Sequence, residues 1–231
     1  MKKIVVFSGA GVSADSGIAT FRDTDGLWAQ HRIEEVCTPE ALAADRSKVI
    51  KFYNMRRQEV LSKAPNAAHT AIAKLEQHFE VEVVTQNVDN LHERAGSSRV
   101  CHLHGELMKL RSTADESLVY PIEDGEQALD ARCEKGSLLR PHIVFFGESV
   151  PMFETAAKIV ARADIFIVVG TSLAVYPAAS LIHYIPAHCQ VYVVDPKIPS
   201  LSGLRNPVEG MAMRAAEGMP LLAERLIKNV L

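Results

Sequence analysis

Small residues follow the first apolar run of the chain with the spacing of a phosphate-binding turn. The run reads KIVVF (3–7), and the turn after it reads GAGVSA (9–14). Glycines at such positions permit a tight turn and let backbone N–H groups approach a pyrophosphate. A plain strand-to-helix turn has the same pattern, so this motif alone does not establish a dinucleotide site.

The segment after this turn departs from that of an ordinary dehydrogenase. Such an enzyme carries an acidic residue on a second strand, about 20 residues further on, where it binds a ribose. Here Phe21-Arg22-Asp23 occupies that interval. We therefore do not expect an ordinary dehydrogenase, and the formation of NADH would contradict this expectation.

Polar side chains follow a second apolar run, VEVVT (81–85). Gln86, Asn87 and Asp89 come directly after it, at a position that faces the ligand crevice when the run is a strand of a parallel sheet. Their amide and carboxylate groups suit hydrogen bonds to a ribose or an amide. Asn87 and Asp89 also suit the start of a helix, and for Asp89 both interpretations stay open.

Two histidines lie in the segment HLHGEL (102–107). On a strand, His102 and His104 would face the same side, but no obvious third ligand accompanies them as a metal pair. Gly105 indicates a sharp turn that places His104 at the rim of the crevice. An imidazole there can act as a base near neutral pH, and a purely structural histidine is the alternative.

Two more runs end in groups that suit a nucleotide. Gly170, Thr171 and Ser172 follow the most apolar run and offer hydroxyl and N–H groups to a phosphate or ribose. Asp195 ends the run QVYVVD (190–195) and can accept from a ribose hydroxyl. A simple turn is the alternative for Asp195.

These groups need a framework of buried strands and intervening helices. Continuous apolar runs favour a parallel sheet over an alternating antiparallel one. The predicted strands are 3–7, 81–85, 142–146, 165–170 and 190–195. The predicted helices are 65–79, 153–163, 178–185 and 220–231. The alternation predicts an α/β fold with a doubly wound, Rossmann-like parallel sheet.

Two stretches interrupt the alternation. Residues 29–64 are mostly helical in pattern, and residues 106–139 are polar and irregular. We expect one domain over 1–231, with a Rossmann-like core at approximately 1–28, 65–105 and 140–231. The two stretches then form a small lobe made of two insertions.

The composition limits the class of partner. The chain has 231 residues, 48% of them hydrophobic, and a net charge of −3. We therefore expect no nucleic-acid or membrane partner. No apolar run approaches the roughly 20 residues of a membrane span, and MKKIVVF suits a buried strand better than a signal peptide. A cytoplasmic location is expected, and a monomer is compatible with the sequence.

The cysteines are widely spaced, which does not indicate a disulfide framework. Each is interpreted as a small buried hydrophobe rather than a redox group. They are Cys37, Cys101, Cys133 and Cys189.

Taken together, the motifs resemble the sirtuin family of NAD-dependent protein-lysine deacylases. Five segments occur in family order and span most of the chain. They are GAGVSADSGIATFR (9–22), TQNVDNLHERAG (85–96), HLHGEL (102–107), LRPHIVFFGE (139–148) and GTSLAVYPAA (170–179). Each segment is weak alone, but their order makes the joint signal strong.

The resemblance implies that NAD is consumed as a co-substrate and that acylated lysine side chains of proteins are the other substrate. His104 would be the catalytic base, and Phe146, Gly147 and Glu148 would present backbone to an extended peptide. The implied NAD-binding residues are Gly9, Ala10, Gly11, Asp15, Phe21, Arg22, Gln86, Asn87, Asp89, Gly170, Thr171, Ser172, Asp195 and Ala215.

In the reaction that the resemblance implies, the acyl-lysine oxygen attacks the nicotinamide ribose and nicotinamide leaves. His104 then deprotonates a ribose hydroxyl, and free lysine and O-acyl-ADP-ribose result. An NAD-binding module without catalysis and a protein ADP-ribosyltransferase remain as alternatives. A module that only binds NAD would release no nicotinamide, so nicotinamide release distinguishes it from an enzyme. A clamp that is specific for the acyl group favours a deacylase over the transferase.

Tyr53 and Arg56 are three residues apart on a predicted helix and so share a face. A phenol and a guanidinium suit a carboxylate. The pattern Y-x-x-R resembles the branch that removes succinyl and malonyl groups, so these are the expected substrates, with acetyl accepted as well. The alternative is an amphipathic helix with solvated arginines, and Arg57 is expected to be solvated.

The sequence departs from the family where most sirtuins bind structural zinc through two C-x-x-C pairs. The four aligned positions here are Ser112, Asp115, Cys133 and Gly136. One thiolate and one carboxylate cannot close a tetrahedral structural site, so no zinc is predicted. Packing must then hold the lobe together, and the expected small core is Leu118, Val119, Tyr120, Ile122 and Leu129.

Overall fold

The computed structural model describes residues 1–19, 32–201 and 203–230. No helix within these residues is both long enough and apolar enough to cross a membrane. In chain order the elements are β1 (Lys3–Ser8), η1 (Ala10–Val12), η2 (Ala14–Ser16), α2 (Ile33–Val36), α3 (Pro39–Ala44), α4 (Arg46–Leu61), α5 (Ala67–Leu75), β2 (Glu80–Thr85), α6 (Leu91–Arg94), β3 (Val100–His102), β4 (Gly105–Ser112), β5 (Val119–Pro121), β6 (Leu139–Ile143), α7 (Phe153–Val160), β7 (Ile165–Val169), η3 (Ala178–Tyr184), β8 (Gln190–Val194), β9 (Val208–Met211) and α8 (Ala215–Lys228).

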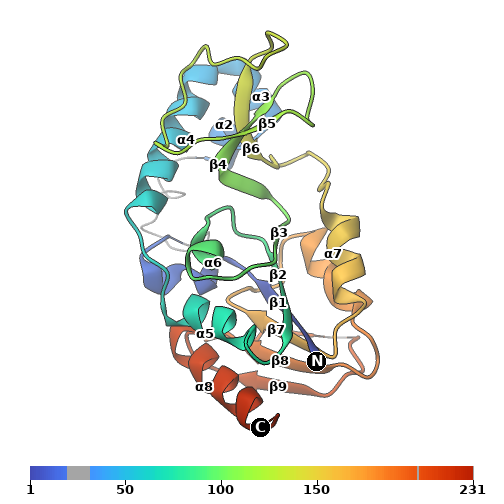
Figure 1. Ribbon diagram of the computed structural model, residues 1–231. Helices are drawn as coiled ribbons and strands as arrows, with labels where there is room; N and C mark the ends of the chain where they lie inside the picture. The colour runs from blue at the N-terminus through green and yellow to red at the C-terminus, as the bar shows by residue number, and fades with distance from the viewer. Residues whose placement is uncertain (20–31, 202, 231) are drawn as a thin grey trace.

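Six strands within the described residues form a parallel sheet in the order β3-β2-β1-β7-β8-β9. From β1 the chain moves outward through β2 to β3, and from β7 it moves outward in the other direction through β8 to β9 (Figure 1). The strand order therefore reverses between β1 and β7. Open α/β sheets bind their ligands at such a switch point, at the carboxyl ends of the strands.

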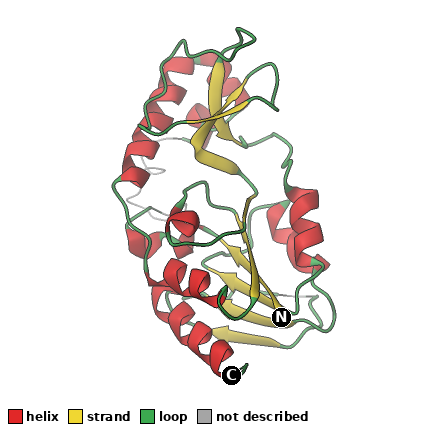
Figure 2. Ribbon diagram, viewed as in Figure 1, coloured by secondary structure: helices red, strands yellow, loops and turns green. Residues whose placement is uncertain are grey.

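Helices cover both faces of this sheet (Figures 1 and 2). Residues of α5 and α8 pack on one face, together with Ile4 and Val6 of β1. Residues of α7 and the 3₁₀ helix η3 pack on the other face, together with Val5 and Phe7. Burial on both faces is the reason why β1 is apolar without alternation. The predicted α/β doubly wound fold is therefore confirmed.

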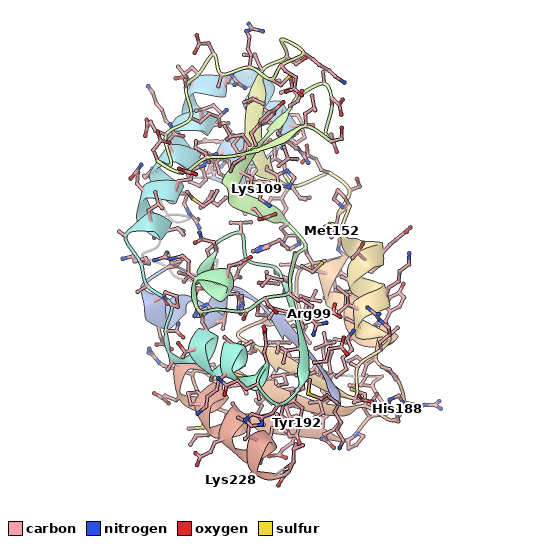
Figure 3. The ribbon with its side chains drawn as sticks, in the orientation of Figure 1. Arg99, Lys109, Met152, His188, Tyr192 and Lys228 are labelled. Atoms are coloured by element: carbon pink, nitrogen blue, oxygen red, sulfur yellow. The ribbon has the colours of Figure 1, made fainter. Side chains whose placement is uncertain are left out.

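A second, antiparallel sheet has the strand order β5-β4-β6. Helices α2, α3 and α4 lie in the same half of the molecule, and α4 contacts β4 and β6 (Figure 1). The side-chain view shows Lys109 of β4 in this half, and Tyr192 of β8 and Lys228 of α8 in the other (Figure 3). The prediction of mostly helical structure within 29–64 is confirmed for α2, α3 and α4.

A strand of the parallel sheet was expected at 142–146, and this prediction is wrong. The chain forms β6 at Leu139–Ile143 instead, and β6 pairs with β4 in the small sheet. An apolar run indicates burial but does not say which sheet buries it. The stretch 106–139 is also not simply irregular, because it contains most of β4 and all of β5. The short strands β3 and β9 were not predicted, since three and four residues give little pattern.

The small core beside β4 differs in part from the expected set. Leu118, Tyr120 and Ile122 belong to it, as predicted, but Val119 and Leu129 are 38% and 45% exposed. Val119 points away because neighbouring side chains on a strand face opposite sides. Other buried members of this cluster are Leu110, Cys133 and Leu139. All four cysteines of the chain are buried and free, as expected.

Arg57 was expected in solvent, and this is wrong because its side chain is fully buried. Its Nε donates to the Leu107 carbonyl oxygen at 2.8 Å, and Nη1 donates to Asn54 Oδ1 at 2.8 Å. Asn54 in turn exchanges two hydrogen bonds of 3.0 Å with the backbone of Gln127. Burial lowers the pKa of Arg57 to about 10, so it stays charged at neutral pH. Arg57 thus fastens α4 to β4 and to the segment around Gln127.

Replacement of this buried arginine should destabilise the fold. Arg57→Ala removes two hydrogen bonds and leaves a cavity, so we expect the free energy of unfolding to fall by about 2–4 kcal/mol. Arg162→Ala is the matched control, because the Arg162 side chain is 63% exposed, and it should change stability by less than about 0.5 kcal/mol. Urea unfolding measures both, and equal midpoints for the two variants would contradict the assigned role.

Candidate active site

A cavity of about 440 Å³ lies at the switch point, where the segments after β1, β2, β7 and β8 meet the small lobe. This volume is in the range of small-molecule sites. The cavity gathers most of the residues that the sequence singled out. These are Gly9, Ala10, Gly11, Tyr53, Arg56, Gln86, Asn87, Asp89, His104, Phe146, Gly147, Glu148, Gly170, Thr171, Ser172 and Asp195.

The loops after β1 and β7 touch through backbone atoms. A Cβ on Gly11 would lie 2.8 Å from the Gly170 Cα, and one on Gly170 would lie 2.3 Å from the Val12 nitrogen. Gly9 N–H donates to the Val169 carbonyl at 3.1 Å, and Gly11 N–H donates to the Gly170 carbonyl at 2.9 Å. The N–H groups of Gly9 and Gly11 are therefore hydrogen-bonded within the protein. The lack of a side chain at Gly11 and Gly170 permits the close contact of the two loops.

Asp89 lies at the start of a helix and also in the cavity lining, so both interpretations that the sequence left open are compatible with its position. Its Oδ1 accepts from the Leu91 N–H at 3.1 Å at the start of α6, while the residue also lines the cavity. Its Oδ2 accepts from Ser13 Oγ at 3.1 Å, and Ser13 Oγ accepts from Asn87 Nδ2 at 3.2 Å. Burial raises the pKa of Asp89, and the hydrogen bonds from Leu91 and Ser13 oppose this rise. The Asn87 and Asp89 side chains are thus oriented by one shared hydroxyl.

His104 is held in one tautomer. Its Nδ1 lies 3.0 Å from the Gln86 carbonyl oxygen, which can only accept, so Nδ1 carries the hydrogen. In the neutral ring, Nε2 is then the nitrogen that can take up a proton. Burial lowers the pKa of His104, which keeps the ring neutral at pH 7. The expected sharp turn is confirmed, since Gly105 has φ +85° and a Cβ there would lie 2.1 Å from the His142 oxygen.

His102 takes no part in a metal pair with His104. Its two ring nitrogens contact the Asn87 carbonyl oxygen and Glu93, and His102 itself is not part of the cavity lining. Within the part of the chain that the structure describes, no three His, Cys, Asp or Glu side chains are placed to hold a metal ion.

The end of the cavity at α4 combines apolar walls with two donors. The Tyr53 ring stacks on Phe145 with centroids 5.8 Å apart, and its hydroxyl donates to Cys37 Sγ at 3.2 Å. Arg56 Nε lies 3.4 Å from Glu59 Oε2. Burial raises the pKa of Tyr53 well above its ordinary value, so the phenol remains a donor at neutral pH.

The loop after β6 is fixed by Glu148. Its carboxylate accepts from Arg140 at 2.5 Å, Arg111 at 3.2 Å and the Phe145 N–H at 2.7 Å. The Phe146 and Glu148 N–H groups donate to carbonyls of Cys37 and Phe145. A peptide pairing with this loop through these two residues would therefore use their carbonyl oxygens.

Two of the expected residues that the structure describes are not among the cavity lining. Asp15 pairs with Arg214 at 3.0 Å, and Ala215 is buried in the core at the start of α8. Phe21 and Arg22 lie outside the described residues.

Sequence reasoning did not place Cys37, Leu107 and Ile143 in the cavity lining. Leu107 and Ile143 have no signal beyond being apolar. Cys37 is 16 positions before the Tyr53 that it contacts, so no local pattern connects the two.

Comparisons with known proteins agree with this geometry. A model of the Sir2 family matches residues 9–177. An NAD-dependent protein deacylase of Aggregatibacter actinomycetemcomitans is 53% identical over 211 residues, which cover 91% of this chain and 100% of that protein. One of Bacteroides thetaiotaomicron is 48% identical over 232 residues, covering 98% and 99%.

Among solved structures, a complex of a Sir2 homologue with NAD superposes with a TM-score of 0.88 at 40% identity. It covers 100% of this chain and 91% of the other. The family match spans more than half of the chain, and the relatives are matched over almost their whole length. This chain therefore belongs to the Sir2 family, the sirtuins.

Proposed function

We propose that this chain is an NAD-dependent protein-lysine deacylase that removes succinyl and malonyl groups and accepts acetyl groups as well. Its relatives of 53% and 48% identity are named NAD-dependent protein deacylases, which supports the reaction class. The acyl preference rests on one observation: Tyr53 and Arg56 line the same cavity as His104.

The two donors suit an acyl carboxylate. The Tyr53 hydroxyl donates to the Cys37 thiol, which is a weak acceptor. A carboxylate is a much stronger acceptor, so transfer of this hydrogen bond from Cys37 to the substrate is favourable. Arg56 adds a positive charge in a cavity walled by Phe52, Leu107 and Ile143, where charge–charge interactions are little screened.

The donor set at the other end suits NAD. Thr171 and Ser172 offer hydroxyls, and Asp195 follows β8 as an acceptor for ribose hydroxyls. Thr171 Oγ1 accepts from Gln86 Nε2 at 2.9 Å, which links the loops after β2 and β7. When bound, NAD supplies the ribosyl group that takes the acyl group. Asn87 and Asp89 orient that ribose, and His104 Nε2 accepts a proton from one of its hydroxyls.

We also propose that the small lobe holds no zinc. Cys133 Sγ donates to Ser112 Oγ at 3.4 Å, and Asp115 pairs with Lys135 at 2.8 Å. Ser112 Oγ also accepts from the Asp115 N–H at 3.2 Å. Hydrogen bonds and the apolar cluster beside β4 thus support this part of the lobe. The cytoplasmic location, the lack of a nucleic-acid partner and the lobe boundaries stay predictions.

Removal of the two donors should abolish the preference for acidic acyl groups. For Tyr53→Phe/Arg56→Met we expect kcat/KM on a succinyl-lysine peptide to fall about 10²–10³-fold, since a buried charge pair is lost. On the matched acetyl-lysine peptide we expect a change of less than about threefold, because the acetyl group has no carboxylate. Mass spectrometry of both peptides with NAD measures this.

Lys51→Met is the matched control, because Lys51 is exposed on the same helix and does not line the cavity. It should leave both activities unchanged. If the double variant lost both activities equally, or if the wild type removed acetyl alone, the carboxylate clamp would be wrong while the deacylase assignment survived.

Metal removal should have no effect. Since one thiolate and one carboxylate cannot close a tetrahedral zinc site, we expect chelator treatment to leave both melting temperature and deacylation unchanged. Elemental analysis of the purified protein provides the independent measurement. One equivalent of zinc per chain, lost together with stability on chelation, would contradict the proposal.

A further inference from the structure

His102 is a buried histidine that does not line the cavity and has no part in the reaction described above. It lies at the end of β3, and both ring nitrogens are engaged. Nδ1 is 2.8 Å from the Asn87 carbonyl oxygen, and Nε2 is 2.6 Å from Glu93 Oε1. The imidazole therefore connects the segment after β2 to helix α6.

These partners define the protonation state of His102. A carbonyl oxygen can only accept a hydrogen bond, and so can an ionised carboxylate. Both ring nitrogens must then carry hydrogen, which makes the ring an imidazolium paired with Glu93. A neutral ring with its hydrogen on Nδ1 would turn the Nε2 lone pair toward the carboxylate, and the contact would become repulsive.

The hydrogen bond from His102 to the Asn87 carbonyl oxygen fixes the backbone of a segment that lines the cavity. The Asn87 N–H donates to Thr85 Oγ1 at 3.0 Å, so His102 holds the other end of the same residue. His104 donates to the Gln86 carbonyl, one residue earlier. The two histidines thus hold consecutive carbonyl groups of the segment that carries Asn87 and Asp89.

We propose that His102, protonated and paired with Glu93, is a positioning residue that holds Asn87 and Asp89 in their reactive orientation. This inference rests on the proposed deacylase function. It adds a group that touches neither substrate and acts only through the segment after β2.

Several charged or titratable groups face His102. Burial opposes its protonation, but the hydrogen bond and charge of Glu93 on α6 outweigh burial and raise its pKa, with help from the Asn87 carbonyl and Glu106 on β4. Asp89 and His92 also interact with it, and burial lowers the pKa of His92, which stays neutral. Lys109 on β4 acts on Glu93, whose pKa is lowered mainly by His102 against the effect of burial.

Two opposite pH effects follow. A raised pKa means that the contribution of His102 is complete below its ordinary pKa of 6.5 and is lost as the pH rises through the folded-state pKa. His104 has a lowered pKa, so its function as a base is lost only as the pH falls below 6.5. The activity should therefore fall on the acidic side through His104 and on the alkaline side through His102.

The test compares pH profiles of nicotinamide release, with NAD and a succinyl-lysine peptide, for wild type, Glu93→Ala and Glu93→Gln. In Glu93→Ala, we expect the alkaline fall to begin about one pH unit or more lower, because His102 loses its counter-charge and the neutral ring has no partner that holds it at Nε2. In Glu93→Gln, the amide can donate to a neutral ring, so we expect most activity to return at high pH and the alkaline fall to flatten.

Glu209→Ala is the matched control, because Glu209 is a half-exposed, ion-paired carboxylate on β9 outside the cavity lining. It should keep the wild-type profile. Histidine NMR titration gives a second readout without turnover, in which the pKa of His102 should fall in both Glu93 variants. Melting temperatures verify that all variants are folded.

The outcomes separate this inference from the proposed function. If all variants had pH profiles of the same shape, or lost the same fraction of activity at every pH, the positioning role would be wrong. The deacylase proposal would remain intact. A His102 pKa that does not respond to Glu93 would also overturn it. A wild type that releases no nicotinamide at any pH would overturn the proposed function, and with it the reactive role of His102.

Discussion

The backbone contact between the loops after β1 and β7 is the constraint on which the rest of the site depends. β1 and β7 are parallel neighbours, so their loops begin side by side at the same edge of the sheet. From there the chain continues toward β2 on one side and toward β8 on the other, which makes this position the switch point. Gly11 and Gly170 approach so closely that a Cβ on either would overlap backbone of the other loop. The segments after β2 and β8 then reach the same edge of the sheet and complete the cavity.

The small lobe closes this cavity from the other side, and buried polar side chains fix its position. Arg57 ties α4 to β4, which directs Tyr53 and Arg56 into the cavity. Glu148 gathers Arg111, Arg140 and the Phe145 N–H, which sets the loop after β6. Each of these groups costs free energy to bury, and hydrogen bonds to neighbouring elements offset part of that cost. The end of the cavity at α4 is thus positioned by polar contacts between elements.

The sequence predicted the parts of the structure that depend on local pattern. Four strands of the large sheet were found because burial on both faces leaves a continuous apolar run, and Tyr53 and Arg56 share the cavity because three residues is nearly one helical turn. Arg57 was wrongly expected in solvent, because the Leu107 carbonyl that it binds comes close only once α4 packs on β4. Its second acceptor, Asn54, lies one helical turn earlier and gives no signal of burial in the sequence. The run at 142–146 was assigned to the wrong sheet for the same reason, since pairing partners are not local.

The reaction itself is tested most directly by its stoichiometry. Wild-type protein would be incubated with NAD and a succinyl-lysine peptide, and nicotinamide, free lysine peptide and O-succinyl-ADP-ribose would be quantified together by mass. A deacylase predicts equal amounts of all three products and none when either substrate is omitted. Nicotinamide that appears while the peptide keeps its acyl group, or ADP-ribose attached to protein, would contradict the account and favour an ADP-ribosyltransferase.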